Sequence, residues 1–308
     1  MLKYIIKRVS AAIVTLFITI TLTFFLMNAV PGNPFMSEKK VSDEVQAQLE
    51  EKYGLNTPLT VQYGNYLKNL VKGDLGISFT CYKDTPVTEL ISEKFPVSAR
   101  LGLYAIILAV FIGVPLGCIA AYFNGKWPDN IIRVTSTLGI AVPSFVVASV
   151  LMAFLACSLN LFPVLYSIKD SSSYVLPVIT LSLYPACYIT RLMRSSMLEA
   201  MGQDYIRTAK AKGMSSFSII FKHALRNSLI PIITYMGPMI AGVLTGAFVV
   251  ENIFTIPGMG LTFVNSISSR DYNIIMGTTV FLAAIIIIMN LICDILYKIV
   301  DPRISLDD

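Results

Sequence analysis

The chain has 308 residues, of which 55% are hydrophobic and only 14% are charged, and its formal net charge is +5. Soluble domains carry roughly 25% charged residues, so this composition excludes an ordinary soluble protein and is typical of a chain embedded in a membrane. The main group of basic residues lies beside apolar stretches rather than on a soluble surface, which argues against a nucleic-acid partner.

Six apolar stretches are long enough, or nearly so, for the roughly 20 residues that a membrane-spanning helix needs. In chain order they are residues 9–30, 101–123, about 134–159, about 175–190, 229–250 and about 274–299. The fourth is short and contains Pro177 and Pro185, so it is either a span or a buried irregular segment. The charge distribution favours a span, and the sequence predicts an all-α polytopic membrane protein with six transmembrane helices.

Basic residues indicate how these spans are oriented. Lys3, Lys7 and Arg8 precede the first span, which places the N-terminus in the cytoplasm by the positive-inside rule. Alternation then places the C-terminus and the basic segment between the fourth and fifth spans inside as well. Residues 31–100 carry eight Lys or Arg and nine Asp or Glu, but a loop of this length is translocated whatever its charge.

Three regions are therefore expected. They are an N-terminal transmembrane helix at residues 1–30, an extracytoplasmic loop region at 31–100, and a five-helix core at 101–308 with a cytoplasmic loop at about 191–228. The five cysteines, at positions 81, 118, 157, 187 and 293, have no paired spacing, so they are interpreted as small buried hydrophobic residues rather than metal ligands or disulfides.

Residues 203–227, "QDYIRTAKAKGMSSFSIIFKHALRN", form a basic segment in this apolar chain, here called the signature segment. A helix over 196–212 would place every fourth residue on one apolar face, namely Met197, Met201, Tyr205 and Ala209. Gly213 suits the left-handed position that ends a helix, and Ser215 or Ser216 can cap the next one.

The second helix of the signature segment would also be amphipathic. Its apolar side would consist of Phe217, Ile220, Phe221, Ala224 and Leu225. Two short amphipathic helices joined at a glycine are consistent with a connector whose basic residues meet lipid head groups, or with a docking site for another protein. Amphipathicity alone leaves both interpretations open.

The segment after the fifth span is rich in turn-forming residues, so it cannot continue as a helix. It is interpreted either as an external gate or contact for a binding protein, or as a structured loop. The residues proposed for the first interpretation are Glu251, Phe254, Pro257, Gly258, Gly260 and Asp271.

Small residues mark one part of the fifth span. Their spacing includes a GxxxG pattern that allows close helix packing, which is favoured over a pore-lining role. The residues are Gly237, Ala241, Gly242, Thr245 and Gly246.

Several motifs resemble one family of membrane proteins. "DYIRTAKAKG" followed by "HALRN" is similar to the cytoplasmic signature of the dipeptide, oligopeptide and nickel permease group of ABC importers. Further motifs similar to this family occur before and after the signature segment, in the same order along nearly the whole chain. They are "KGDLGISF", "AVPSFVVASVL", "RLMRSSMLEAM", "VVENIFTIPGMG", "RDYNIIMG" and "DILYKIVDPRI". Within the group, the sequence of these motifs most resembles that of the oligopeptide B-type subunits.

This resemblance implies a type I ABC importer permease fold, with a long extracytoplasmic loop after the first helix. In the family, the signature lies in a loop that places a short coupling helix in a groove of a separate ATPase subunit. The matching residues here are Asp204, Tyr205, Arg207, Thr208, Ala209, Ala211, Lys212 and Gly213, followed by His223, Ala224, Leu225, Arg226 and Asn227.

The match to the broader EAA pattern of ABC importers is incomplete. That pattern has Glu-Ala-Ala six residues before the glycine, whereas this chain has Arg207, Thr208 and Ala209 there. The difference fits the peptide branch of the family. It also means that no particular glutamate is assigned the docking contact.

The resemblance further implies the partners. They are a second, homologous permease that completes a heterodimer, two ATP-binding subunits, an extracytoplasmic peptide-binding protein and membrane lipid. No G-x-x-x-x-G-K-[ST] sequence occurs in the chain, so no cofactor and no enzymatic activity are expected here, and ATP and Mg are expected in the ATPase subunits. Oligopeptides are the favoured substrate, with dipeptides, glutathione-like peptides and nickel chelates as alternatives.

Two other classes of protein were weighed. An ion-coupled secondary carrier would show inverted repeats and ion ligands at the membrane midplane, and a membrane-embedded enzyme would assemble a metal site or a nucleophile with its base. The sequence has a single histidine, scattered cysteines and no clustered acids in its spans. Both alternatives are therefore less favoured than a permease.

Overall fold

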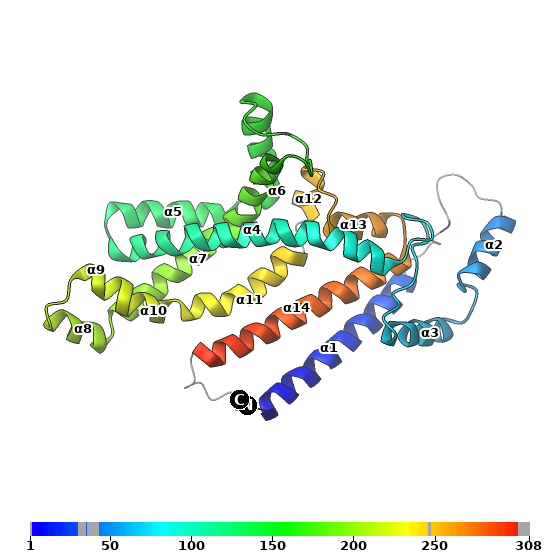
Figure 1. Cartoon of the computed structure of the whole chain (residues 1–308), viewed down its shortest axis with the longest axis horizontal. Coiled ribbons are helices and arrows are strands. Elements are labelled where there is room, and N and C mark those ends of the chain that lie inside the picture. The colour runs from blue at the N-terminus through cyan, green and yellow to red at the C-terminus, as the bar shows by residue number, and fades with distance from the viewer. Residues whose placement is uncertain (1, 30–34, 36–42, 246–247, 301–308) are drawn as a thin grey trace. The chain divides into compact units, whose positions relative to one another are not determined.

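The computed structural model describes residues 2–29, 35, 43–245 and 248–300, and these residues are predominantly helical (Figure 1). In chain order the elements are α1 (Leu2–Ala29), α2 (Asp43–Lys52), α3 (Leu59–Val71), α4 (Val87–Tyr122), α5 (Trp127–Ala141), α6 (Ser144–Leu151), η1 (Met152–Ser158), η2 (Ser171–Tyr174), α7 (Val175–Met201), α8 (Asp204–Ala211), α9 (Ser216–Ser218), η3 (Ile219–Ala224), α10 (Leu225–Ser228), α11 (Ile230–Thr245), α12 (Phe248–Ile253), α13 (Met259–Ser268) and α14 (Tyr272–Val300). The elements η1 and η3 are π-helical, and η2 is a 3₁₀ turn.

Four helical stretches among the described residues are long and apolar enough to cross a membrane. They are Ile6–Ala29, Val87–Tyr122, Ser171–Met201 and Tyr272–Cys293. They contain most of the first, second, fourth and sixth predicted stretches, and they confirm that these form long apolar helices. The chain is thus a multi-pass membrane protein by the length and composition of its helices.

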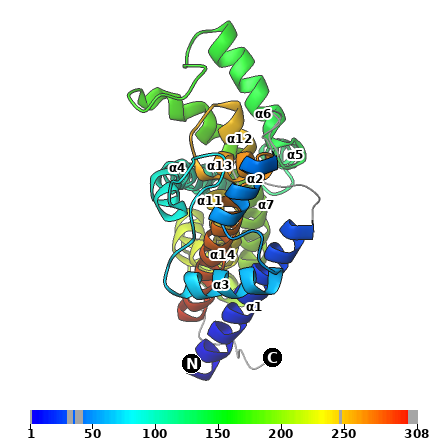
Figure 2. The same ribbon diagram turned by 90° about the vertical axis from the view of Figure 1, so that its right-hand side faces the viewer.

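The third predicted stretch is not one straight helix. The stretches Trp127–Ala141 and Ser144–Ser158 meet at an angle of 101°, and Figures 1 and 2 both show α6 leaving the direction of α5. Val142 and Pro143 are extended at the break. Proline has no N–H to continue the helical ladder and disfavours helical geometry in the residue before it, so the helix ends there.

The fifth predicted stretch, residues 229–250, is described except at residues 246 and 247. Its apolar helix covers Ile230–Val243, below the length of a full span. The described residues thus contain four candidate spans, or five if the bent pair counts as one, rather than the six predicted.

The chain divides into two compact units, so α4 and α14 each contribute to both. One unit comprises Met1–Val97 with Pro257–Ile287, and the other comprises Ser98–Ile256 with Ile288–Asp308. Pro257–Ile287 thus belongs to the same unit as the N-terminal part of the chain.

The first unit is held together by apolar contacts of the first half of α14. Ile20 and Phe24 of α1 cluster with Met276 and Val280 of α14. Gly277 lies so near α4 that an added Cβ would be 2.5 Å from Val87 Cγ1. The start of α4 therefore packs closely on α14 in this unit.

The second unit has a core that runs along α4, α7 and α11 and continues into the signature segment. Its buried members are Ile106, Ala109, Cys118, Ala121, Ala186, Ile189, Met193, Met197, Ala200, Ile206, Ala209, Ile219, Ile220, Ala224, Ile232 and Met239. One continuous apolar core therefore connects long helices with the segment singled out by the sequence.

Two glycines set the distance between α4 and α7. A Cβ added to Gly113 would be 2.8 Å from the Ala186 carbonyl oxygen, and one added to Gly117 would be 2.5 Å from Met193 Cβ. The two glycines have the GxxxG spacing that lets helix backbones approach closely. The sequence pattern predicted close helix packing at residues 237–246, whereas the GxxxG spacing of Gly113 and Gly117 was not recognised from the sequence.

We expect Gly117→Ala to destabilise the purified chain by about 1–3 kcal/mol, because the methyl group overpacks the α4–α7 contact. Thermal unfolding in detergent measures this as a lower midpoint. Gly242→Ala is the matched control, since a Cβ at Gly242 meets no atom within 4 Å. Equal midpoints for the two variants would contradict the close contact.

Candidate functional site

The signature segment begins at a break in the helical path. Helix α7 runs to Met201, Gln203 is extended, and α8 begins at Asp204. The predicted continuous helix over 196–212 is therefore wrong, because residues 196–201 belong to α7 and residues 204–211 form α8. The break lies at Gly202, and glycine is a poor helix former because it loses the most backbone freedom on folding.

The end of α8 agrees with the prediction. Gly213 has a φ of +73°, and its N–H donates to the Lys210 carbonyl at 3.0 Å. A residue with a Cβ is strained in this left-handed conformation. Ser215 Oγ then accepts a hydrogen bond from the backbone N–H of Ser218 at 3.3 Å, which confirms the predicted serine cap at Ser215.

Both halves of the signature segment bury apolar residues in the same core as α7. Ile206 and Ala209 of α8 are buried, and so are Ile219, Ile220 and Ala224 after the turn. The segment is consequently a folded extension of the core rather than a loose linker.

The predicted apolar stripes are only partly correct. Ala209 and Ala224 are buried as expected, but Tyr205, Phe217 and Phe221 are 39%, 69% and 51% exposed. The break after α7 and the π-helical turn of η3 both change the rotation of the chain, so a uniform helical period does not describe which residues face inward.

One hydrogen bond joins the first and last parts of the signature segment. Asn227 Nδ2 donates to Tyr205 OH at 2.9 Å, across 22 positions of sequence. The two residues line an open pocket of about 340 Å³ together with Glu199 and Gln203. "DYIRTAKAKG" and "HALRN" therefore form one surface in space.

The other matching residues divide by exposure. Ala209 and Ala224 are buried, and His223 and Leu225 are half-buried. The exposed residues, which offer a surface to a partner, are Asp204, Tyr205, Arg207, Thr208, Ala211, Lys212, Gly213, Arg226 and Asn227. This set, here called the signature surface, excludes Ala209 from any direct contact with a second protein.

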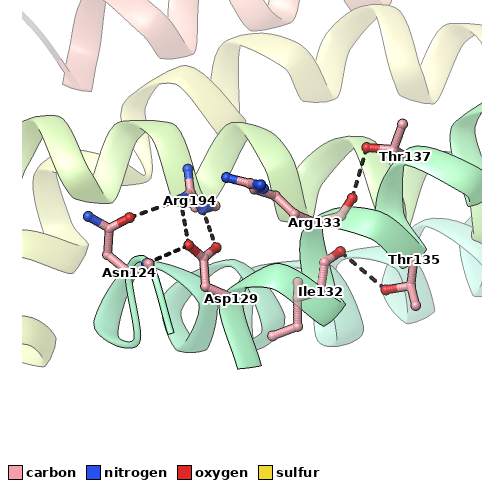
Figure 3. A network of polar contacts seen from close by, with 8 residues as sticks. Asn124, Asp129, Ile132, Arg133, Thr135, Thr137 and Arg194 are labelled. Carbon is pink, nitrogen blue, oxygen red and sulfur yellow. Dashed lines mark hydrogen bonds and ion pairs between the residues drawn. The ribbon is translucent and has the colours of Figure 1, made fainter. Parts of the chain in front are cut away.

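An ion pair at the base of α7 was not foreseen from the sequence. Figure 3 shows Arg194 of α7 and Asp129 of α5 in a two-pronged pair, with Nε donating to Oδ1 at 2.6 Å and Nη2 to Oδ2 at 2.7 Å. Arg194 also donates to Asn124 Oδ1 at 2.9 Å, and Gly125 N–H donates to Asp129 Oδ2 at 2.9 Å. Two parallel charge-assisted bonds fix direction as well as distance, so α7 is held against the α4–α5 turn.

We expect Asp129→Asn to destabilise the chain by about 3 kcal/mol, because it leaves the Arg194 guanidinium without its fully buried carboxylate partner. Thermal unfolding of Asp129→Asn, Arg194→Gln and the double variant measures their coupling. The double variant should lose less than the sum of the two single changes.

Arg191→Gln is the control for this cycle, since Arg191 is exposed one turn earlier on α7. Its effect should add to that of Asp129→Asn. An additive result for Arg194→Gln as well would contradict an energetic role for the pair.

Glu251 and Phe254, proposed as an external gate or partner contact, are buried. Glu251 is 1% exposed and accepts a hydrogen bond from Ser98 Oγ at 2.6 Å, and Phe254 is 2% exposed. A polar contact to a second protein needs an accessible carboxylate. Glu251 does not offer one here, and the structure instead assigns it an internal bond between α4 and α12.

Asp271 is likewise internal. Its Oδ2 accepts hydrogen bonds from Ser78 Oγ at 2.6 Å and from the N–H groups of Thr80 and Cys81 at 2.8 and 3.1 Å. Its Oδ1 lies 3.4 Å from the N–H of Ile274 in the first turn of α14. The carboxylate thus ties residues 78–81 to the start of α14, which makes Asp271 an internal polar group in this structure.

The turn residues of the outer segment are also enclosed. Gly258 and Gly260 are buried, and Pro257 is half-buried. Gly258 is extended and precedes α13. These residues shape the entry to α13, and they present little surface to a partner in this structure.

The small residues of α11 do not behave alike. A Cβ on Gly237 would be 2.6 Å from Cys293 Sγ, whereas one on Gly242 would meet no atom within 4 Å. Ala241 is buried. The side chain of Thr245 and residue Gly246 lie outside the described residues, so the GxxxG prediction is not settled.

Within the described ranges, no group of three or more His, Cys, Asp or Glu side chains could hold a metal ion. The chemistry of the signature surface is that of exposed charged and polar groups on a rigid helical support. Such a surface binds a protein partner or lipid head groups.

The fold and this surface together define a class of protein: a multi-pass membrane component with the helical fold of ABC transporter permeases. The chain matches the MetNI methionine ABC transporter in an inward-facing conformation with a TM-score of 0.56 at 14% identity, covering 69% of this chain and 97% of that one. This likeness concerns the fold alone.

The family follows from the sequence comparison. Residues 113–306 match the model described as binding-protein-dependent transport system inner membrane component, and residues 1–102 match the model of its N-terminal region. The chain belongs to this family of binding-protein-dependent inner membrane components.

Full-length relatives carry the same assignment. The oligopeptide transport system permease protein OppB of Haemophilus influenzae is 48% identical over 306 residues, which is 99% of both chains. The dipeptide transport system permease protein DppB of Bacillus subtilis is 47% identical with the same coverage, and OppB of Escherichia coli is 44% identical.

Proposed function

We propose that this chain is a transmembrane permease subunit of an ATP-driven, binding-protein-dependent peptide importer, and that oligopeptides are its substrates. The observation that carries the proposal is the signature surface: two sequence motifs of the family, brought together by the Tyr205–Asn227 bond on a packed extension of α7. Relatives named as oligopeptide and dipeptide permeases, at 44–48% identity along nearly the entire chain, support the substrate class.

In this proposal the chain crosses the membrane six times, with both termini in the cytoplasm. The bent α5–α6 pair counts as one span and α11 as another. The signature segment then lies inside and residues 31–100 lie outside, in agreement with the basic residues beside the first span.

The remaining components are supplied by other chains. A homologous permease completes the pathway, two ATPase subunits bind ATP and Mg and dock below, and an extracytoplasmic binding protein delivers the peptide. The absence of a phosphate-binding loop sequence from this chain fits that division of roles.

The coupling route follows the packing of the second unit. An ATPase that moves the signature surface also moves α7, because Ile206 and Ala209 share a core with Met193 and Met197. The Asp129–Arg194 pair then transfers the displacement to α5. Rigid connections of this kind convert a push at the cytoplasmic end into rearrangement of the helices around the pathway.

We expect Ala211→Glu to weaken ATPase association and ATP-dependent peptide uptake by at least tenfold. Ala211 is exposed next to Lys210 and Lys212, and a new carboxylate there alters both the shape and the charge of the docking surface. The measurement is co-purification of the ATPase subunits from membranes, followed by uptake in proteoliposomes.

Two controls accompany this variant. Ala211→Ser keeps a small neutral side chain at the same position, and Asn65→Glu adds a carboxylate at an exposed site on α3. Both should retain uptake. If Ala211→Glu also retains ATPase association and uptake, the segment is a lipid-facing connector and the docking proposal fails.

Dipeptides are the second candidate substrate, because the relatives from Bacillus subtilis and Lactococcus lactis are named as dipeptide permeases. Competition between a labelled tetrapeptide and unlabelled dipeptides or tetrapeptides separates the two. We expect tetrapeptides to compete more strongly. Stronger competition by dipeptides would reverse the assignment.

A further inference from the structure

A pocket of about 680 Å³ lies in the second unit, away from the signature surface. It is formed by the middle of α4, by η2 and residues shortly before it, and by the start of α7. Its wall contains Arg100, Tyr104, Tyr166 and Tyr174 beside aliphatic residues of α7. Volumes of roughly 300–1,000 Å³ are typical of sites for small ligands.

The three tyrosines form a fixed aromatic wall. The hydroxyls of Tyr166 and Tyr174 are 2.8 Å apart, and their rings meet edge-on with centroids at 5.2 Å. Tyr104 meets Tyr174 edge-on at 6.1 Å. The backbone N–H of Tyr166 donates to the Phe254 carbonyl at 3.2 Å, which fixes the connecting residues beside the C-terminal end of α12.

Hydrogen bonds within residues 167–173 also stabilise the segment that carries Tyr166 and Tyr174. Ser173 Oγ donates to the carbonyl oxygens of Ser167 and Asp170 at 3.0 and 2.6 Å. Asp170 accepts from the N–H and the hydroxyl of Ser172 at 2.9 and 2.7 Å. These bonds hold the segment of residues 166–174 together, and Tyr166 and Tyr174 belong to it.

Arg100 is the charged group of the pocket. Within the described part of the chain its guanidinium has no ion pair and no hydrogen bond, and no residue lining the pocket is acidic. A guanidinium offers two parallel N–H donors that match a carboxylate. Burial raises the pKa of Tyr166 to about 12, so its hydroxyl stays protonated at neutral pH.

The chemistry therefore selects one end of a peptide. A carboxylate gains a cation and neighbouring hydroxyls, whereas an amino terminus meets the positive charge of Arg100 and no compensating acid. Aromatic rings and the aliphatic side chains of Val175 and Ile179 offer apolar surface to the side chains of a short peptide.

We propose that this pocket transiently holds the free C-terminal carboxylate of the peptide during its passage, with Arg100 as the anion-binding residue. The proposal rests on the proposed function and adds to it a site within this chain. It makes the permease itself, in addition to the delivery protein, sensitive to the terminal carboxylate of the substrate.

The test uses the complete transporter in proteoliposomes with its delivery protein in excess. Uptake of one peptide is compared with uptake of its C-terminal amide, for wild type and for Arg100→Gln. For each transporter, the preference is the uptake of the free acid divided by the uptake of the amide. The delivery protein contributes equally to this quotient in wild type and in Arg100→Gln, so its contribution cancels when the two quotients are compared. We expect the preference for the free acid to fall about tenfold in Arg100→Gln, as for loss of a charge-assisted hydrogen bond.

Two further variants sharpen the result. Arg100→Lys should recover part of the preference, because it keeps the charge but loses the two-pronged geometry. Lys169→Gln removes a nearby exposed positive charge that does not line the pocket, and it should leave the preference unchanged. Arg100 makes no hydrogen bond or ion pair with the residues that the structure describes, so we expect its replacement to leave folding intact.

Other outcomes overturn the proposal. An unchanged preference for the free acid in Arg100→Gln, or an equal loss of uptake for both peptides, shows that the pocket does not bind the C-terminal carboxylate. Native mass spectrometry with phosphatidylglycerol covers the other anion source: lipid retained by wild type and lost in Arg100→Gln, with an unchanged peptide preference, assigns the pocket to a head group.

Failure of this proposal is distinguishable from failure of the proposed function. If wild type takes up neither peptide, the assignment as a peptide importer fails. If wild type takes up both and only the Arg100 dependence is missing, that assignment stands and only the pocket is reassigned.

Discussion

The organisation of the second unit depends on the close contact of α4 and α7 at Gly113 and Gly117. Without side chains at these two positions the backbones approach to a distance that any larger residue prevents. This contact places α7 within the core that continues into the signature segment. The location of the signature surface is therefore determined by a contact deep in the helical core, several turns away.

Buried polar groups fix the ends of helices in both units. Asp129 binds Arg194 and the Gly125 N–H, Glu251 binds Ser98, and Asp271 binds residues 78–81. A buried carboxylate is costly unless its oxygens are paired, so each of these groups favours one arrangement of its neighbours. Apolar packing alone is not directional, so these polar contacts fix how the helix ends are positioned relative to their neighbours.

Much of the fold could be predicted because its signals are local. Long apolar stretches predict α1, α4, α7 and α14, and the glycine rule predicts the end of α8 at Gly213. The motif order along the chain identifies the family and the signature segment without any knowledge of contacts. These features depend on residues close together in sequence.

The rest depends on residues that are distant in sequence. Asp129 and Arg194 are 65 positions apart and Asp271 and Ser78 are 193 apart, so no local pattern pairs them. Glu251 and Asp271 were candidate contacts for a partner because they lie in or near a turn-rich segment, and no local pattern indicates that Ser98 and Ser78 donate hydrogen bonds to them. Phe217 and Phe221 were placed on one face with Ala224 because the pattern was counted with a uniform helical period, which η3 interrupts.

The π-helical turn of η3 has a mechanical consequence. A π turn holds one residue more than an α turn, and successive residues of an α-helix differ by about 100° of rotation. If η3 tightened to α geometry, the chain on its N-terminal side would rotate by about one such step relative to α10. Phe217, which precedes η3, therefore owes its direction relative to α10 to the π-helical geometry of η3. The π-helical turn thus sets the rotation of the first half of the signature segment relative to the helices that follow it.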